Sequence, residues 1–222
     1  MLTRVIQIGT ARAAPPPLHI VMLPGAYHDL EDFVRAGFDQ ALAARERAVE
    51  LVLAAPALAH LNDRGWLAPL RHEIIAPRRA RGGELWLGGI SLGAFMALRF
   101  AADSDEDLDG LCLLGPYLGS RIIAAEVAAQ PADMRYSPAA LADDDDERRV
   151  WHYVRGFSSR RRAPRVFAGY GNEDRFADTQ RLLAQWLPPG SCEVLPGTHD
   201  WPVWRQLWDN FLDRHDRHGN CP

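Results

Sequence analysis

Short apolar runs bounded by Gly or Pro recur along the chain, with mixed or polar segments between them. They are HIVMLPG (19–25), VELVLAAP (49–56), GELWLGGIS (83–91), DGLCLLGP (109–116), RVFAGYG (165–171) and SCEVLPG (191–197). Their hydrophobicity is continuous rather than alternating, which is the pattern of a parallel strand covered on both faces. We therefore expect a mostly parallel sheet of about six or seven strands.

The segments between these runs have the apolar spacing of helices. Residues 29–48 predict one helix that starts after a cap at Asp29, and Leu92 to Ala102 predict another directly after Ser91. A last helix is predicted by apolar residues at steps of three and four: Trp204, Leu207, Trp208, Phe211 and Leu212. Alternating strands and helices indicate a doubly wound α/β fold, which binds ligands at the carboxyl ends of its strands.

Two segments interrupt this alternation, residues 57–82 and residues 117–164. The second contains Ser137 and Pro138, an N-cap and first-turn pair that predicts a helix running to about Phe157. We expect residues 117–164 to form a small helical insertion that acts as a lid or cap and selects the substrate.

Length and composition are those of an ordinary globular chain. With 222 residues, 47% hydrophobic and 24% charged, we expect one domain over residues 1–222. The formal net charge of −4 supplies no basic field, so nucleic acid is not an expected partner. The first apolar stretch is broken by Arg4, Gln7 and Arg12, and no later run is long enough for a membrane span. We expect a cytoplasmic protein, and the sequence leaves its oligomeric state open.

Cysteine and histidine spacing predicts neither a disulfide framework nor a metal site. The three cysteines, Cys112, Cys192 and Cys221, are far apart and odd in number, so we expect reduced thiols, the first two in strands. His215 and His218 lie near Cys221 in a polar tail without an HExxH or CxxC pattern. We expect no metal and no cofactor.

The segment LWLGGISLGAFMAL contains a GxSxG pattern, GISLG, between an apolar strand and an apolar helix. A turn from strand to helix at one residue forces Ser91 into a strained backbone conformation. Larger side chains two positions away would collide, which explains Gly89 and Gly93. This pattern exposes a serine hydroxyl at the carboxyl end of a strand, where it can act as a nucleophile.

With these features, the chain resembles the α/β-hydrolases from about His19 to Leu212, and its compact size resembles their small serine esterases. The resemblance implies a nucleophile after a strand, an acid after a later strand and a histidine after the last. Ser91, Asp174 and His199 occur in that order. Asp174 follows Gly171 as in the family's GxxD, and His199 follows the last predicted strand in LPGTHDWPVW. Glu173 and Asp178 are alternative acids, and Asp174 could instead cap the next helix.

The resemblance also implies two backbone amides that receive the negative charge of the attacked carbonyl oxygen. Leu92 supplies the first, and LPGAYHD supplies the second from Ala26 or, as second choice, Tyr27. Pro24 and Gly25 stand where the family commonly has His-Gly, which leaves the hydrogen bonding of this loop open. PGAY could also be only a tight turn.

Four side chains are candidate contacts for substrate, because they fall at strand ends or in the adjoining loops: Tyr27, His28, Tyr117 and Trp201. Trp66 is a weaker candidate. If the aromatic ones line the cleft, an apolar acyl or alcohol group would suit it.

The sequence thus predicts a serine hydrolase that cleaves a small-molecule carboxylic ester or thioester through an acyl-enzyme on Ser91. Two alternatives remain open: an acyltransferase that uses the same three residues, and a non-catalytic binding protein with the same fold. The natural substrate cannot be read from these residues.

Overall fold

The computed structural model describes residues 2–9, 18–45, 48–56, 65–104, 107–130, 141–142, 144–157 and 163–219. Side chains are described within these ranges except at residues 2–4, 7, 9, 56 and 217–219.

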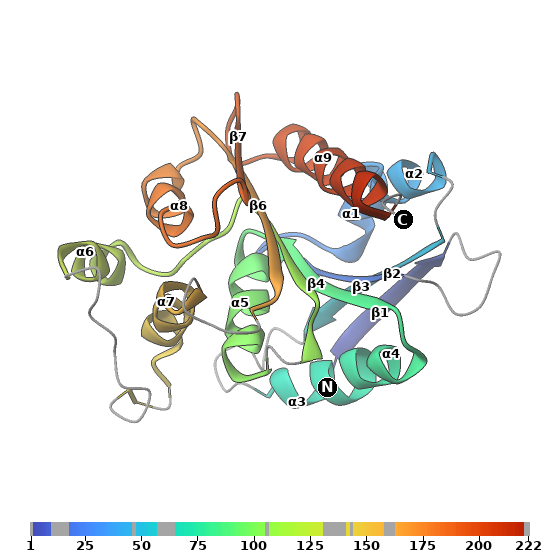
Figure 1. Ribbon diagram of the computed structural model, residues 1–222, viewed down its shortest axis with the longest axis horizontal. Coiled ribbons are helices and arrows are strands. Elements are labelled where there is room, and N and C mark those ends of the chain that lie inside the picture. Colours follow the sequence, from blue (N-terminus) through green and yellow to red (C-terminus); the bar gives the residue numbers. More distant parts are fainter. Residues whose placement is uncertain are drawn as a thin grey trace.

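A seven-stranded sheet runs through the molecule, and its strands lie in the order β1-β3-β2-β4-β5-β6-β7. Only the β1–β3 pair is antiparallel; every other neighbouring pair is parallel (Figure 1). The strands are β1 (Leu2–Gly9), β2 (Leu18–Leu23), β3 (Val49–Pro56), β4 (Glu84–Ile90), β5 (Gly110–Leu114), β6 (Arg165–Gly171) and β7 (Cys192–Leu195). The predicted fold class and the six predicted strands are confirmed.

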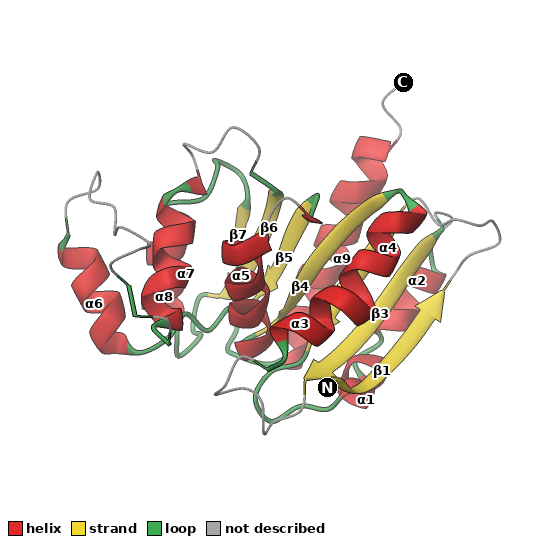
Figure 2. Ribbon diagram, turned by 90° about the horizontal axis from the view of Figure 1, so that it is seen from below, coloured by secondary structure: helices red, strands yellow, loops and turns green. Residues whose placement is uncertain are grey.

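Helices cover both faces of this sheet (Figure 2). One face carries α1 (Leu30–Arg35), α2 (Phe38–Ala43) and α9 (Trp201–Gly219). The other helices are α3 (Leu67–Pro69), the π-helix η2 (Leu70–Ile75), α4 (Ala76–Arg81), α5 (Leu92–Ser104), α6 (Arg121–Ala129), α7 (Asp146–Arg155) and α8 (Ala177–Ala184). Because strands β2 to β6 are covered from both sides, their apolar residues are almost entirely buried.

Strand β1 was not among the predicted strands. It pairs with β3 at the edge of the sheet, where Val5 is exposed while Ile6 and Ile8 pack against the core. Such one-sided burial gives an alternating pattern instead of a continuous apolar run. The polar positions in this stretch therefore belong to an edge strand.

The single helix predicted over residues 29–48 is wrong. Asp29 caps α1 as expected, through reciprocal hydrogen bonds with Asp32 of 3.0 and 2.9 Å. The helix then ends, and Gly37 adopts a left-handed conformation (φ 80°) from which α2 starts in a new direction. Glycine tolerates this conformation without a steric penalty, so the helical apolar pattern is interrupted there.

The helix predicted from Ser137 to Phe157 is also wrong in its extent. Residues 137 and 138 lie outside the described residues, and positions 141–142 and 144–145 are not helical. Helix α7 begins only at Asp146, where the carboxylate of Asp145 caps it by accepting from the amide of Arg148 at 3.1 Å. An aspartate cap next to a charged first turn thus sets the true start of the helix.

In the described part of residues 57–82, helices α3, η2 and α4 cover the sheet beside α5. Trp66 lies in this apolar layer with 3% of its surface exposed. Within the described ranges, no helix combines the length and apolar character that crossing a bilayer requires.

Candidate active site

Ser91 stands alone between the last residue of β4 and the first residue of α5. Its φ of 54° is the only positive φ of a non-glycine residue in the described ranges. The glycines on either side are sterically required: a Cβ on Gly89 would lie 2.4 Å from the carbonyl carbon of Gly93, and one on Gly93 would lie 2.1 Å from the carbonyl oxygen of Leu23. The local sequence therefore dictates a tight, strained turn that lifts the serine above the sheet.

Hydrogen bonds hold the backbone of this turn in place. The amide of Ser91 donates to the carbonyl of Leu114 at 3.0 Å, and the amide of Tyr117 donates to the carbonyl of Ser91 at 3.1 Å. Both partners lie at or just beyond the end of β5. The position of the hydroxyl is thus fixed by the neighbouring strand as well as by α5.

The three side chains that the resemblance singled out meet at the carboxyl edge of the sheet. Nε2 of His199 lies 2.9 Å from Oγ of Ser91, and Nδ1 lies 2.6 Å from Oδ2 of Asp174. An ionised carboxylate only accepts, so Nδ1 carries the hydrogen and Nε2 is left to accept from the hydroxyl. The chain of contacts can therefore move a proton from serine to imidazole.

Asp174 is buried, and three donors surround its carboxylate. Besides His199, the amide of Phe176 donates to Oδ1 at 2.8 Å and the side chain of Gln180 donates to Oδ2 at 3.1 Å. Burial alone would raise the pKa of this carboxyl, but these hydrogen bonds outweigh it and the pKa lies below its ordinary value. The group is thus held as a carboxylate.

The two side-chain hydrogen bonds of His199 go to Ser91 and Asp174, and to neither alternative acid. Glu173 and Asp178 are exposed, and Asp178 pairs with Arg181. Asp174 is not the cap of α8, whose N-cap is Phe176 without a side-chain cap hydrogen bond; its Oδ1 accepts from the amide of Phe176, and its Oδ2 meets the histidine.

Two aromatic rings fix the imidazole of His199. The rings of Trp204 and Phe176 approach it edge to face, with centroids 4.9 and 5.1 Å away. A Cβ on Gly115 would come within 2.5 Å of Nε1 of Trp204, so this glycine makes room for the indole. Sequence reasoning assigned Trp204 only to the core stripe of the last helix, and it did not single out Phe176 or Gln180.

A cavity of about 430 Å³ opens above Ser91. Three loops that follow strands β2, β6 and β7 supply most of its lining: Ala26, Tyr27, His28, Glu173, Arg175, Thr198 and His199. The side chain of Tyr27 is 98% exposed and stands free at the mouth. The cavity therefore brings the serine hydroxyl, the imidazole and the loop after β2 to one place.

Of the predicted oxyanion donors, Ala26 and Tyr27 line this cavity, and Leu92 directly follows Ser91 in the chain. Leu92 is the first residue of α5, so its amide has no acceptor within the helix. Ala26 lines the cavity with Tyr27, in the loop where the amide of His28 donates to the carbonyl of Gly25 at 3.2 Å.

Of the four predicted substrate contacts, two line the cavity over Ser91 and two do not. Tyr27 and His28 line the cavity over Ser91. Tyr117 lines two neighbouring cavities instead, one beside α6 and one beside the start of α7. Trp201 packs edge to face against His28 and Trp204, with ring centroids 5.1 and 5.3 Å away. Burial lowers the pKa of His28, although the nearby charge of Asp32 opposes this effect.

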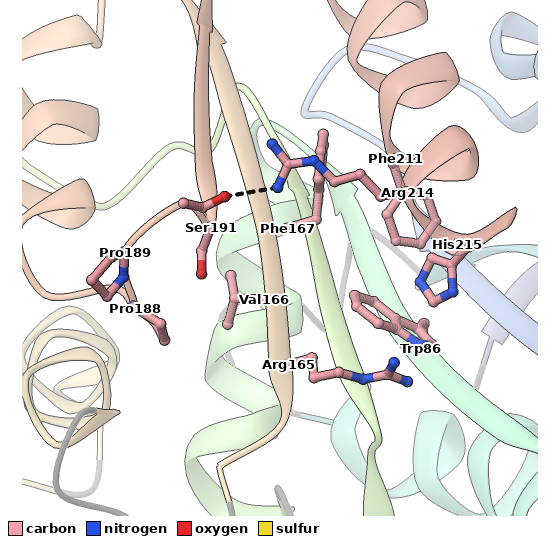
Figure 3. A pocket seen from close by; sticks show the side chains of 11 residues that line it. Trp86, Arg165, Val166, Phe167, Pro188, Pro189, Ser191, Phe211, Arg214 and His215 are labelled. Carbon is pink, nitrogen blue, oxygen red and sulfur yellow. Dashed lines mark hydrogen bonds between the residues drawn. The ribbon is translucent and has the colours of Figure 1, made fainter. Parts of the chain in front are cut away.

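Another cavity, of about 280 Å³, lies at the opposite edge of the sheet (Figure 3). It is lined by residues near the starts of β4 and β6, among them Trp86 and Arg165, by the loop before β7 and by α9, whereas Ser91 follows the end of β4. Its two arginines are already engaged: Arg165 with Glu84 at 2.8 Å, and Arg214 with the carbonyl of Gly190 at 2.7 Å. It is not part of the site around Ser91.

The described residues contain no cluster of three or more His, Cys, Asp or Glu side chains placed to hold a metal ion. Of the tail residues considered above, the side chain of His218 and all of Cys221 lie outside them. Cys112 in β5 and Cys192 in β7 are free thiols, and burial raises the pKa of Cys192 to about 11.

Solved structures with the same architecture were found along nearly the whole chain. Est1E from Butyrivibrio proteoclasticus superposes with a TM-score of 0.65 and 15% identity, covering 96% of this chain and 94% of that one. The chain adopts the α/β-hydrolase fold. A ferulic acid esterase gives a TM-score of 0.64 at 15% identity, with 96% and 98% covered.

A third α/β-hydrolase neighbour is the S-formylglutathione hydrolase FrmB from Staphylococcus aureus. Its TM-score is 0.60 at 13% identity, with 90% of this chain and 81% of that one covered. No protein-family model matches the sequence, and no curated protein matches it. At these identities the likeness shows the fold alone.

Proposed function

We propose that this α/β-hydrolase is a serine hydrolase that cleaves a small-molecule carboxylic ester or thioester through an acyl-enzyme on Ser91. The observation that carries the proposal is the continuous hydrogen-bonded chain from Ser91 through His199 to Asp174, at the floor of an open cavity. A strained serine, a histidine and a buried carboxylate in this order are the groups that acyl transfer requires.

In the first half of the reaction, Oγ of Ser91 attacks the carbonyl carbon and its proton passes to Nε2 of His199. The tetrahedral intermediate collapses, and the imidazolium returns that proton to the departing alcohol or thiol. Asp174 holds the imidazole in the tautomer that can accept at Nε2 and stabilises its charged form. The product of this half is an ester between the acyl group and Ser91.

In the second half, water attacks the acyl-enzyme while His199 removes one of its protons. The carboxylic acid leaves, and the proton returns to Oγ of Ser91. Negative charge develops on the carbonyl oxygen in both halves. We assign its stabilisation to the backbone amides of Leu92 and Ala26, with Tyr27 as the alternative to Ala26. No cofactor is needed for either half.

The names of the structural neighbours agree with this chemistry. They include an esterase of ferulic acid, an S-formylglutathione hydrolase and a monoacylglycerol lipase, all of which act on esters or thioesters by their printed names. These names support ester or thioester cleavage here without specifying the substrate.

We also propose that residues 1–222 form one hydrolase domain and that residues 117–164 form its cap. The described part of this segment contains α6 and α7, and α6 lines a cavity that shares Arg175 with the cavity over Ser91. An element in this position can control which substrates reach the serine.

The test is hydrolysis of p-nitrophenyl esters and acyl thioesters of graded chain length by the wild-type protein and by Ser91→Ala. Ser104→Ala is the matched control, because Ser104 is also buried but lies at the far end of α5. We expect Ser91→Ala to lose turnover while circular dichroism stays unchanged, and Ser104→Ala to keep it. Unchanged turnover in Ser91→Ala would refute the proposal. Product analysis with added alcohols or amines separates hydrolysis from acyl transfer.

A further inference from the structure

A second cavity adjoins the one over Ser91. It measures about 640 Å³ and runs between α6 and α8. Small and apolar side chains form much of its wall: Ala124, Ala125, Ala128, Phe176 and Leu182. Arg175 lines both this cavity and the one over Ser91, so the two adjoin.

Three arginines also line the cavity between α6 and α8: Arg121, Arg175 and Arg181. Arg181 pairs with Asp178, the single acidic residue of the lining. Among the described residues, Arg121 and Arg175 form no ion pair with a carboxylate. Arg175 lies over the ring of Phe176, 4.9 Å from its centroid. The cavity thus combines an apolar wall with two guanidinium groups that form no ion pair with a carboxylate in the part of the chain that the structure describes.

The carboxylate of Glu147 contacts the lining at Ser120, where it accepts hydrogen bonds from the backbone amide and the hydroxyl at 2.9 and 2.8 Å. It belongs to α7 and does not line the cavity between α6 and α8.

We infer that the substrate of the proposed hydrolase carries a carboxylate at the end of an apolar chain, and that the cavity between α6 and α8 binds this part. The apolar wall takes the hydrocarbon chain, and the forks of Arg175 and Arg121 take the carboxylate, whose geometry matches a guanidinium. The inference rests on the proposed function: the ester bond breaks at Ser91 as described, and the carboxylate only positions the chain.

The experiment compares two p-nitrophenyl esters of equal chain length, the octanoate and the hydrogen suberate, which ends in a free carboxylate. We expect the wild-type protein to favour the suberate in kcat/KM, and Arg175→Gln to reduce that preference, the ratio of the two kcat/KM values, about fivefold, as for a partly exposed ion pair. Arg121→Gln should reduce it in the same direction.

Arg165→Gln is the matched control. It removes the same charge at the opposite edge of the sheet, where Arg165 pairs with Glu84, and it should leave the preference intact. A second pair of esters, 4-(octanoyloxy)benzoate and phenyl octanoate, places the carboxylate on the leaving group. An Arg175-dependent preference in either pair supports the inference and tells which side of the ester occupies the cavity.

The inference is overturned if neither pair shows a preference for the anionic ester that Arg175→Gln reduces more than Arg165→Gln does. This result is distinguishable from failure of the proposed function. If octanoate hydrolysis is lost in Ser91→Ala, the proposed function stands and only the inference fails. If octanoate hydrolysis survives in Ser91→Ala, both the proposed function and the inference fail.

Discussion

The side-chain amide of Gln180 donates to Oδ2 of Asp174 at 3.1 Å, the same oxygen that lies 2.6 Å from Nδ1 of His199. The same amide nitrogen also donates to the carbonyl of Pro116 at 3.2 Å, which fixes the orientation of the amide. Gln180 is fully buried on α8. It therefore acts on the proposed chemistry through Asp174, as a positioning residue.

Replacing this donor by an acid of the same size, Gln180→Glu, should make the activity pH-dependent in a new way. At pH 8 the ionised carboxylate repels Asp174, and we expect kcat to fall about tenfold with little change in KM. Toward pH 5 the new carboxyl gains a proton and can donate as the amide does, so the ratio of variant to wild-type kcat should rise. Gln206→Glu, on the exposed side of α9, is the control. A ratio that stays flat with pH would show that Gln180 has only a structural role.

Asp174→Asn should lower kcat by about a thousandfold or more and leave KM nearly unchanged, because an amide at this position no longer selects the productive imidazole tautomer. Asp178→Asn is the matched control, since the carboxylate of Asp178 is exposed and pairs with Arg181. Steady-state kinetics with a p-nitrophenyl ester measure both variants. Equal losses in the two variants would contradict the assignment of Asp174 as the acid.

The positive φ of Ser91 predicts a difference between two inactive variants. Ser91→Gly and Ser91→Ala both remove the hydroxyl, but only glycine relieves the strain of a φ of 54°. We expect Ser91→Gly to have a free energy of unfolding about 1 kcal/mol higher than Ser91→Ala, after allowance for the larger unfolded-state entropy of glycine. Urea unfolding measures this difference, and the opposite order would argue against a strained turn.

A buried ion cluster at the amino ends of β2 and β3 should make stability depend on pH. Glu50, 2% exposed, contacts His19 and Arg81 and lies 3.3 Å from Arg78. Burial would raise the pKa of Glu50, but hydrogen bonds from Arg81 and His19 and the charge of Arg78 bring it below its ordinary value.

A carboxyl whose pKa is lowered by folding stabilises the folded state above the pKa of the unfolded chain, and this contribution disappears as the pH falls through the folded-state pKa. Glu50→Gln should therefore cost about 3 kcal/mol at pH 7. The difference from the wild type should shrink once the pH falls below the ordinary value of 4.5. Urea unfolding at several pH values tests this, with Glu84→Gln as a more exposed control. A difference that grows on acidification would contradict the prediction.

Strands β2 to β7 and the serine turn were predictable from the sequence because their causes are local. A strand covered on both faces must be apolar throughout, and a turn at Ser91 needs small residues at positions 89 and 93. The set of Ser91, Asp174 and His199 was implied by the resemblance to the α/β-hydrolases, and the three side chains can meet because the carboxyl ends of parallel strands lie along one edge of the sheet.

Other features could not be predicted because their causes are distant contacts. Nothing near Gln180 in the sequence indicates a bond to Asp174, and Trp204 shares the spacing of core residues although its ring contacts His199. The break at Gly37 was not predicted for a local reason: the apolar residues on both sides of it continue a helical pattern. Arg175 was also missed, because its position between two cavities depends on α6 and α8 together.

The most direct test of the account is covalent labelling with a fluorophosphonate, in which Oγ of the nucleophile displaces fluoride from phosphorus. Mass spectrometry of the intact and digested protein should find one adduct, on the peptide that contains Ser91, and should find none in Ser91→Ala. Loss of ester hydrolysis should follow labelling in proportion. An adduct on another residue with Ser91 unmodified, or equal labelling of Ser91→Ala, would contradict the account.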